Sequence, residues 1–210
     1  MARRRSDDKR QRILQAAVKV FARKGYFAAK VSEIAKRAGV ADGTIYLYFR
    51  NKEDILVSLF DEIMAEHVAE GRQALARATT PAERLRVVAE RHLGLLGRNR
   101  DLAIVFQVEL RQSTKFMKRF SASWLRDYFA LLDDAIEEAQ NDGTLRADLP
   151  RKLVTRAFFG ALDEMVTSWI LADKEYDLVR WAAPLVDLFL NGAALSRVPM
   201  PVEAALAGAD

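Results

Sequence analysis

Apolar residues recur at helical spacing along almost the whole of this chain. Between residues 7 and 24, Ile13, Leu14, Ala17 and Phe21 fall on one face of a helix, and similar spacing continues downstream. Runs that alternate apolar and polar residues, as strands do, are absent from the sequence. The pattern predicts an all-α protein of about nine helices.

Gly, Pro and Asn residues mark the ends of these predicted helices. Gly25 ends the first helix, Asn51 and Asp54 have the spacing of a capping box, and Thr80-Pro81 supplies another start signal. Tyr26 and Phe27 are expected to tuck under the helices that follow. The expected helices lie at about residues 7–24, 31–49 (a pair of short helices), 51–75, 81–97, 101–113, 116–141, 150–172 and 177–196.

The segment from Val31 to Asp54, VSEIAKRAGVADGTIYLYFRNKED, has the layout of a helix-turn-helix. Ile34, Ala35 and Ala38 form a small apolar face, and Gly39 suits the positive φ of a sharp turn. The next short helix carries Thr44, Tyr46, Leu47 and Tyr48, which we expect to face outward. In a helix-turn-helix this second helix lies in the major groove of DNA.

Positive charge is concentrated around this motif. Residues 1–52 hold fourteen Lys and Arg against four Asp and Glu, a local net charge of +10, whereas the whole chain carries +4. Residues 1–6 are expected to form a mobile basic arm, although Arg3, Arg4 and Arg5 alone could be a solvated surface. A focused positive face beside a helix-turn-helix favours phosphate binding.

Composition gives an enzyme little support. The chain has no Cys, only two His (His67 and His92), no nucleophile-elbow motif and no phosphate-binding Gly loop. Apolar runs stay well short of the roughly 20 residues that a membrane span needs, and no signal-peptide core follows the basic start. We expect a cytoplasmic protein without a metal, a cofactor or a membrane partner.

Two runs of the N-terminal sequence are similar to the motifs of a known family. The runs ILQAAVKVFARKGY and VSEIAKRAGVADGTIYLYFRNKEDIL resemble the TetR family of bacterial transcriptional regulators. The resemblance implies a three-helix DNA-binding domain at residues 1–52 and a connecting helix at 53–79. It further implies a larger helical ligand-binding and dimerisation domain at 80–197, followed by a flexible tail at 198–210.

The same resemblance implies which residues contact the operator. Val31 stands where many relatives have Thr, so Ser32 is expected to take over that phosphate contact. Asp42 either caps the recognition helix, the interpretation we favour, or accepts from a cytosine amino group. Tyr46 and Tyr48 either donate to phosphates or are half-buried packing residues. The expected DNA contacts are Ser32, Ala41, Asp42, Gly43, Thr44, Tyr46, Tyr48 and Lys52.

The C-terminal part resembles the FadR-type branch of that family. The matching runs are LAIVFQVELRQS, FGALDEMVTSWIL and DKEYDLV. The resemblance implies a repressor of fatty-acid degradation genes, released from a palindromic operator by long-chain acyl-CoA. A regulator of a multidrug efflux pump is the alternative, kept open by the acids Glu109, Asp163 and Glu164.

A pocket for such an effector should be mostly apolar with a few placed polar groups. Apolar residues at helical spacing are often ordinary core, and His92 could be a hydrogen-bonded core histidine. The candidate ligand residues are His92, Leu96, Phe106, Glu109, Arg111, Gln112, Trp124, Tyr128, Phe158 and Leu162. Cations for the CoA phosphates would come from Arg86, Arg98, Arg100, Arg111, Lys115, Lys118 and Arg119, with Arg111 preferred.

A palindromic operator calls for a two-fold protein. In the family the last two helices form a four-helix bundle across a homodimer, and the corresponding helices here carry apolar bulk. Part of that stripe must be intrachain core. The candidate interface residues are Phe159, Val166, Ile170, Trp181, Leu185 and Leu188.

Overall fold

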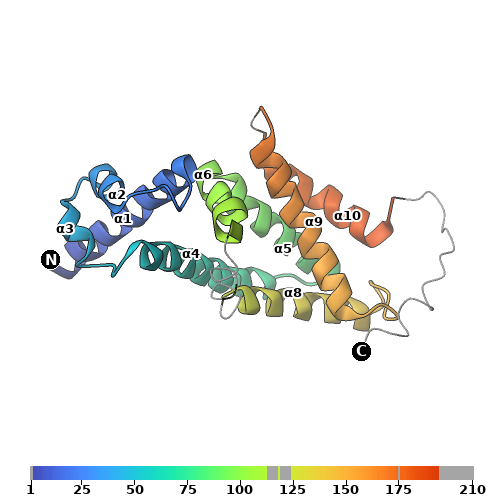
Figure 1. Ribbon diagram of the computed structural model, residues 1–210. Helices are drawn as coiled ribbons and strands as arrows, with labels where there is room; N and C mark the ends of the chain where they lie inside the picture. The colour runs from blue at the N-terminus through green and yellow to red at the C-terminus, as the bar shows by residue number, and fades with distance from the viewer. Residues whose placement is uncertain (1, 113–117, 119–123, 175, 194–210) are drawn as a thin grey trace.

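The computed structural model describes residues 2–112, 118, 124–174 and 176–193, and this part of the chain is helical, without strands (Figure 1). It confirms the predicted all-α class, with nine α-helices in the described residues. These are α1 (Ala2–Lys24), α2 (Val31–Ala38), α3 (Asp42–Ile45), α4 (Lys52–Leu75), α5 (Pro81–Gly97), α6 (Arg100–Ile104), α8 (Trp124–Asn141), α9 (Arg151–Leu171) and α10 (Ala182–Asn191). The π-helix η1 (Val105–Glu109) and the 3₁₀ helices η2 (Leu110–Gln112) and η3 (Leu178–Trp181) complete the list.

Helices α1, α2 and α3 gather at one end of the molecule, and the predicted turn lies between α2 and α3. Ile34, Ala35 and Ala38 are buried, as the spacing predicted. Gly39 has φ of 66°, in the left-handed region that a glycine reaches without a steric cost. A Cβ there would lie 2.8 Å from the Arg12 guanidinium, which itself hydrogen-bonds the Ala38 carbonyl. A glycine is therefore required at position 39 both by the backbone conformation and by the lack of room for a Cβ.

Two expectations for this end of the chain were wrong. Helix α1 continues back to Ala2, so residues 2–6 belong to the helix and not to a mobile arm. Tyr26 is buried as expected, but Phe27 is 65% exposed. The reason is that Tyr26 packs against Phe21 with ring centroids 5.5 Å apart, which leaves its neighbour pointing outward.

Helix α4 connects the two ends of the molecule. Its 24 residues span roughly 36 Å. The predicted N-cap is confirmed, because the Asn51 side chain accepts from the Asp54 N–H at 2.8 Å. The Asp54 carboxylate accepts from the Arg50 N–H at 2.9 Å, so the reciprocal half of the expected capping box is shifted by one residue.

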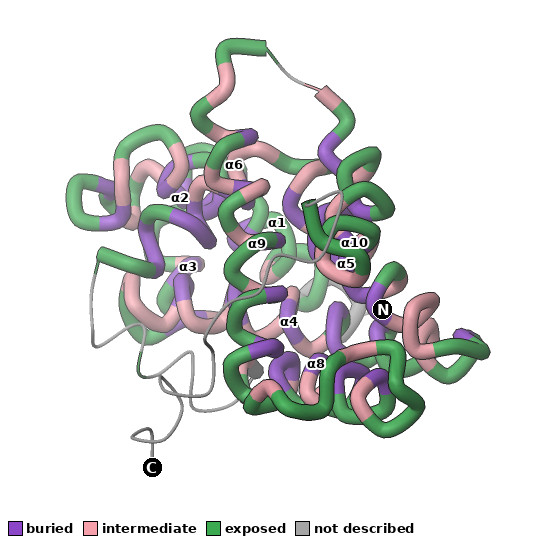
Figure 2. The backbone as a smooth tube through the Cα atoms, turned by 90° about the vertical axis from the view of Figure 1, so that its right-hand side faces the viewer, coloured by how far each residue is buried: buried purple, intermediate pink, exposed green. Residues whose placement is uncertain are grey.

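The larger half is built around α5, which packs against α4, α8, α9 and α10. Thr80 caps α5 and Pro81 occupies its first turn, as predicted. Buried residues gather on the helix faces that look toward one another (Figure 2). One buried apolar cluster runs from α1 through α4 into α5, α8 and α9, so the two halves share a continuous core.

The segment expected as one helix at 101–113 is instead divided into α6, η1 and η2. A π-helix has a wider turn than an α-helix, and such turns are frequent at functional sites. Phe106, Gln107 and Glu109 are all buried in this short stretch. Phe106 packs against Phe60 of α4, Gln107 bonds Asp163 of α9, and Glu109 bonds the backbone of Tyr26, so this stretch contacts three separate parts of the molecule.

Of the remaining expected helices, one agrees with the structure, one is divided and one lies partly outside the described residues. Helix α9 matches the expected 150–172 closely, whereas 177–196 divides into η3 and α10. The first part of the expected 116–141 helix and the tail at 198–210 lie outside the described residues. None of the described helices is both long and apolar enough to cross a membrane.

Candidate ligand cavity and DNA-binding surface

A small cavity of about 100 Å³ lies among α4, α5, η1, α8 and α9. Five of the ten residues expected at the ligand line it. These are His92, Leu96, Phe106, Arg111 and Tyr128. Helices far apart in the sequence thus bring together a mostly apolar chamber with a few polar groups, which is the usual composition of a small-molecule site.

The polar end of the cavity contains a buried histidine and tyrosine. His92 Nδ1 lies 2.8 Å from the Tyr128 hydroxyl. Burial lowers the pKa of His92 to about 4 and raises the pKa of Tyr128 above its ordinary value. Both side chains are therefore neutral at neutral pH. His67 of α4 also lines the cavity, and its pKa is lowered to about 4, mainly by burial.

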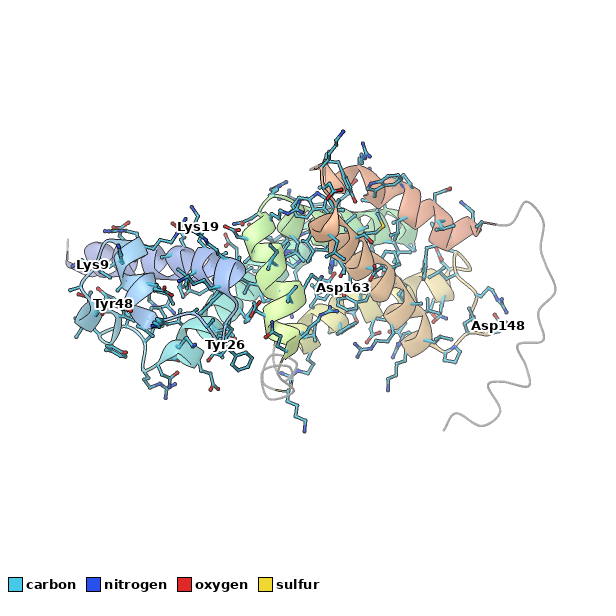
Figure 3. All side chains as sticks on the ribbon, turned by 45° about the horizontal axis from the view of Figure 1, so that its top comes forward. Lys9, Lys19, Tyr26, Tyr48, Asp148 and Asp163 are labelled. Carbon is cyan, nitrogen blue, oxygen red and sulfur yellow. The ribbon has the colours of Figure 1, made fainter. Side chains whose placement is uncertain are left out.

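A hydrogen-bond network leads from the cavity wall to the surface. Gln107 Nε2 donates to Asp163 Oδ1 at 2.7 Å, and Arg111 donates to the other carboxylate oxygen at 2.5 Å. Figure 3 shows Asp163 on α9, in the middle of the larger half. The Asp163 side chain is largely buried, whereas that of Arg111 is half-exposed. The hydrogen-bond network therefore ends at Arg111, a cation that a bound anion could reach.

Two buried polar atoms in the cavity wall have no hydrogen-bond partner among the described residues. They are His92 Nε2 and Gln107 Oε1. Buried polar atoms are nearly always paired, so each such exception calls for an explanation. A polar ligand group in the cavity would pair both atoms.

The structure places four of the other five expected ligand residues elsewhere. Phe158 and Leu162 are fully buried in the core, and Gln112 is exposed at the end of η2. The Glu109 carboxylate accepts from the Tyr26 backbone N–H at 2.6 Å and so faces the loop after α1. The side chain of Trp124 lies outside the described residues.

Sequence reasoning missed several residues of the cavity wall. No local pattern singles them out, because each lies on the same apolar stripe as ordinary core residues. Asp163 was considered only as an acid that suits a cationic drug. The missed residues are Met64, His67, Gln107, Leu125, Phe159 and Asp163.

The helix-turn-helix presents most of the expected DNA contacts to solvent. Tyr46 is 58% exposed, and a Cβ at Gly43 would meet nothing within 4 Å. Ser32, Ala41 and Asp42 are exposed, whereas Thr44 and Tyr48 are half-buried, and Tyr48 packs against the core. Asp42 does not cap α3: the N-cap is Ala41, and Asp42 is the first helical residue, where its charge suits the helix dipole.

Lys52 has an internal role that the sequence did not indicate. Its ammonium donates to three backbone carbonyls, those of Tyr26 at 2.7 Å, Phe27 at 3.0 Å and Ala29 at 2.8 Å. It also lies 4.7 Å from the centroid of the Tyr26 ring. Desolvation lowers the pKa of Lys52. Lys52 thus fixes the loop between α1 and α2 onto the start of α4.

The residues expected at a dimer interface differ in how far they are exposed. Val166 is fully buried within one chain, and Phe159 is half-buried and lines the cavity. Ile170 and Leu185 are half-buried. Trp181 and Leu188 are exposed, and the neighbouring Leu171 is 76% exposed. An apolar surface therefore remains on the last two helices.

The exposed helix-turn-helix, the long helix leading from it and the cavity together define a DNA-binding protein with a helical effector domain. Residues 13–59 match the model described as bacterial regulatory proteins, tetR family, and residues 60–192 match the YsiA-like protein, C-terminal region. The chain belongs to the tetR family of bacterial regulatory proteins.

Its similarity to characterised relatives extends over most of the chain. It is 41% identical over 184 residues to the fatty acid metabolism regulator protein of Bacillus subtilis. The alignment covers 88% of this chain and 95% of that relative. The crystal structure of FadR from Bacillus subtilis in complex with stearoyl-CoA has a TM-score of 0.82 at 41% identity, covering 88% of this chain and 99% of that one. FadR from Bacillus halodurans, a fatty acid degradation regulator, has a TM-score of 0.81 at 43% identity over the same shares.

Proposed function

We propose that this protein is a transcriptional repressor of fatty-acid degradation genes that leaves its palindromic operator when it binds a long-chain acyl-CoA. The observation that carries the proposal is the cavity, because its wall includes α4, the helix that begins at the helix-turn-helix. Relatives that are similar over nearly their whole length regulate fatty acid metabolism, and one was solved with stearoyl-CoA. We place the protein in the bacterial cytoplasm, where operator DNA and acyl-CoA are both found.

The chemistry of the cavity suits the two parts of such a ligand. Its apolar wall would take the acyl chain once the surrounding helices separate, because a long chain is larger than the cavity of about 100 Å³. Burial of each CH₂ contributes about 0.8 kcal/mol. The phosphates of CoA would lie toward Arg111, whose planar guanidinium can form paired hydrogen bonds with phosphate oxygens. Arg100, another candidate cation, instead donates to the carbonyls of Ile170 and Ala172 at the end of α9.

Two connections would carry ligand binding to the DNA-binding end. Met64 and His67 place α4 in the cavity wall, and Lys52 ties the start of that helix to the loop before α2. Phe106 of η1 lines the cavity and packs against Phe60 of α4, with ring centroids 4.6 Å apart. A ligand that moves η1 or α4 would change the spacing of the two recognition helices in a dimer. It would release DNA only if it binds the free and DNA-bound states with different affinity.

Operator binding would use the exposed residues of α2 and α3. We propose contacts from Ser32, Ala41, Asp42, Gly43, Thr44, Tyr46 and Tyr48, with the charge of Lys52 beside them. Proteins of this family are dimers, and the exposed apolar surface on α9 and α10 supports the same arrangement here. Two copies related by a two-fold axis match the two halves of a palindrome.

The efflux-regulator alternative has less support. A cationic drug would be expected to meet an unpaired acid in the cavity. Asp163 already accepts from Gln107 and Arg111, and Glu109 faces the Tyr26 N–H. Glu164, the third acid that kept this alternative open, is exposed on α9, accepts from the Ser168 hydroxyl and does not line the cavity.

The test combines operator selection with a ligand titration. A random duplex library would be selected on the purified protein, and the enriched site would be titrated by fluorescence anisotropy with palmitoyl-CoA, palmitate or CoA alone. We expect a palindromic site that palmitoyl-CoA releases, while CoA alone has no effect. Equal affinity of palmitoyl-CoA for the free and the DNA-bound protein would contradict the mechanism. Release by a cationic dye but not by palmitoyl-CoA would favour the efflux regulator.

A further inference from the structure

We propose that the polar end of the cavity binds the thioester group of the ligand and the amide that follows it. His92 Nε2 donates to the thioester carbonyl oxygen, and Gln107 Oε1 accepts from the first amide N–H of the CoA arm. This inference rests on the function proposed above and goes further, because it states which bond of the acyl-CoA is recognised and by which atoms. Both protein atoms are buried and without a partner in the described residues.

We assign His92 Nε2 as a hydrogen-bond donor from the contact of His92 with Tyr128. The neutral imidazole carries one proton, and the ring nitrogen that lacks it is an acceptor. The Tyr128 hydroxyl lies 2.8 Å from Nδ1, deep in the protein. Nδ1 is the atom that the phenol contacts within the described residues, so we assign the phenol as the donor of this bond and the imidazole proton to Nε2. The cavity then presents an N–H donor that a carbonyl oxygen satisfies.

The contact with Asp163 sets Gln107 Oε1 as an acceptor. An ionised carboxylate only accepts hydrogen bonds, so the Gln107 atom that faces it must be the amide nitrogen. That contact is 2.7 Å long. The carbonyl oxygen of Gln107 is consequently the atom left for the ligand. Asp163 is itself held by Arg111, which fixes the orientation of the amide from the other side.

One donor and one acceptor match an acyl-CoA better than a free fatty acid. In acyl-CoA the thioester carbonyl is followed by sulfur, two methylenes and an amide N–H, so an acceptor and a donor lie close together. A fatty acid carboxylate offers acceptors alone, which would face Gln107 Oε1 unfavourably, and its charge would lose its water at the buried end of the cavity. The hydrogen-bond network from Gln107 through Asp163 to the half-exposed Arg111 marks the direction in which the CoA arm leaves the cavity.

The test compares palmitoyl-CoA with S-hexadecyl-CoA, a thioether that keeps the chain, the sulfur and the CoA but has no carbonyl. Calorimetric titration of the wild-type protein should give at least about tenfold tighter binding of palmitoyl-CoA, since the thioether leaves a buried donor unpaired. His92→Phe should lose this preference. His67→Phe, in the same wall but without an orphaned nitrogen, is the matched control and should keep it.

Gln107→Met separates the second contact from the first. Both ligands carry the amide N–H, so this variant should weaken both by a similar factor and keep the preference for the thioester. A carbonyl label adds a readout that does not depend on affinity. Infrared difference spectra of palmitoyl-CoA with ¹³C at the thioester carbon should show a shift of the carbonyl band on binding to wild-type protein but not to His92→Phe.

The outcomes distinguish this inference from the function on which it rests. Equal affinity of wild-type protein for palmitoyl-CoA and the thioether, or an unshifted carbonyl band, would overturn the thioester contact and leave an acyl-CoA regulator. Loss of the preference in His67→Phe as well would also overturn the assignment to His92. Failure of wild-type protein to bind either ligand would overturn the proposed function itself.

Discussion

The carboxylate of Glu109 accepts a hydrogen bond of 2.6 Å from the backbone N–H of Tyr26. Glu109 belongs to η1, whose Phe106 and Gln107 line the cavity, while Tyr26 lies in the loop that precedes the helix-turn-helix. Figure 3 shows Tyr26 at the junction of the two halves. A single π-helical turn thus contacts both the cavity and the DNA-binding end, so movement of η1 acts on both.

Replacing Glu109 should therefore affect stability and ligand response together. Glu109→Leu removes the acceptor for the Tyr26 N–H, and loss of one partner of a buried hydrogen bond costs about 1–3 kcal/mol. Urea unfolding should show this loss, and anisotropy should show a smaller effect of palmitoyl-CoA on operator affinity. Glu109→Gln keeps an acceptor oxygen and is the control. Wild-type ligand response in Glu109→Leu would mean that α4 alone transmits the signal.

Lys52 offers a test that separates bracing from DNA contact. Lys52→Met removes three hydrogen bonds to the 26–29 loop, so the free energy of unfolding should fall, by about 1–3 kcal/mol. If the ammonium also neutralises a phosphate, the slope of log affinity against log salt should flatten by about one unit. We expect both changes. An unchanged slope with lowered stability would leave Lys52 as a brace and remove it from the DNA contacts.

The apolar surface on α9 and α10 should hold two copies together. Leu188 is 52% exposed in one chain, so Leu188→Asp should weaken a dimer without disturbing the core. Sedimentation velocity should then show monomers. Leu47→Asp places the same charge on an exposed leucine of the helix-turn-helix and should leave the dimer intact. A dimeric Leu188→Asp protein would relocate the interface.

Stability should fall in acid because of the cavity histidines. Burial lowers the pKa of both His67 and His92 to about 4, below the ordinary value of 6.5. The unfolded chain then binds more protons between these values, so the stabilisation is complete above pH 6.5 and is lost as the pH falls toward 4. Each histidine contributes a slope of up to about 1.4 kcal/mol per pH unit within this window.

Urea unfolding between pH 6.5 and 5 would measure this effect before the carboxylates contribute. Glu33 and Glu70 also have lowered pKa values, held down mainly by hydrogen bonds from Lys24 and Arg91, and their contribution is lost at more acid pH. His67→Gln should remove about half of the slope. A slope that is the same in this variant would show that His67 titrates normally in the folded protein.

The sequence by itself determined the features that depend on near neighbours along the chain. The all-α class, the ends of most helices, the turn at Gly39 and the caps at Asn51 and Thr80 all follow from spacing and local backbone chemistry. The helix-turn-helix and the family resemblance follow from the same short runs. The charge concentrated in residues 1–52 also needs no structure to be recognised.

Tertiary structure decided which apolar and polar residues of each helix meet. His92 and Tyr128 lie 36 positions apart, and Gln107 and Asp163 lie 56 apart, so no local pattern could pair them. Phe158 and Phe159 are adjacent in sequence, yet one is core and the other lines the cavity, because a helix turns by about 100° per residue. The π-turn at η1 was decided in the same way, since long-range packing, rather than local preference, fixes where Phe106, Gln107 and Glu109 point.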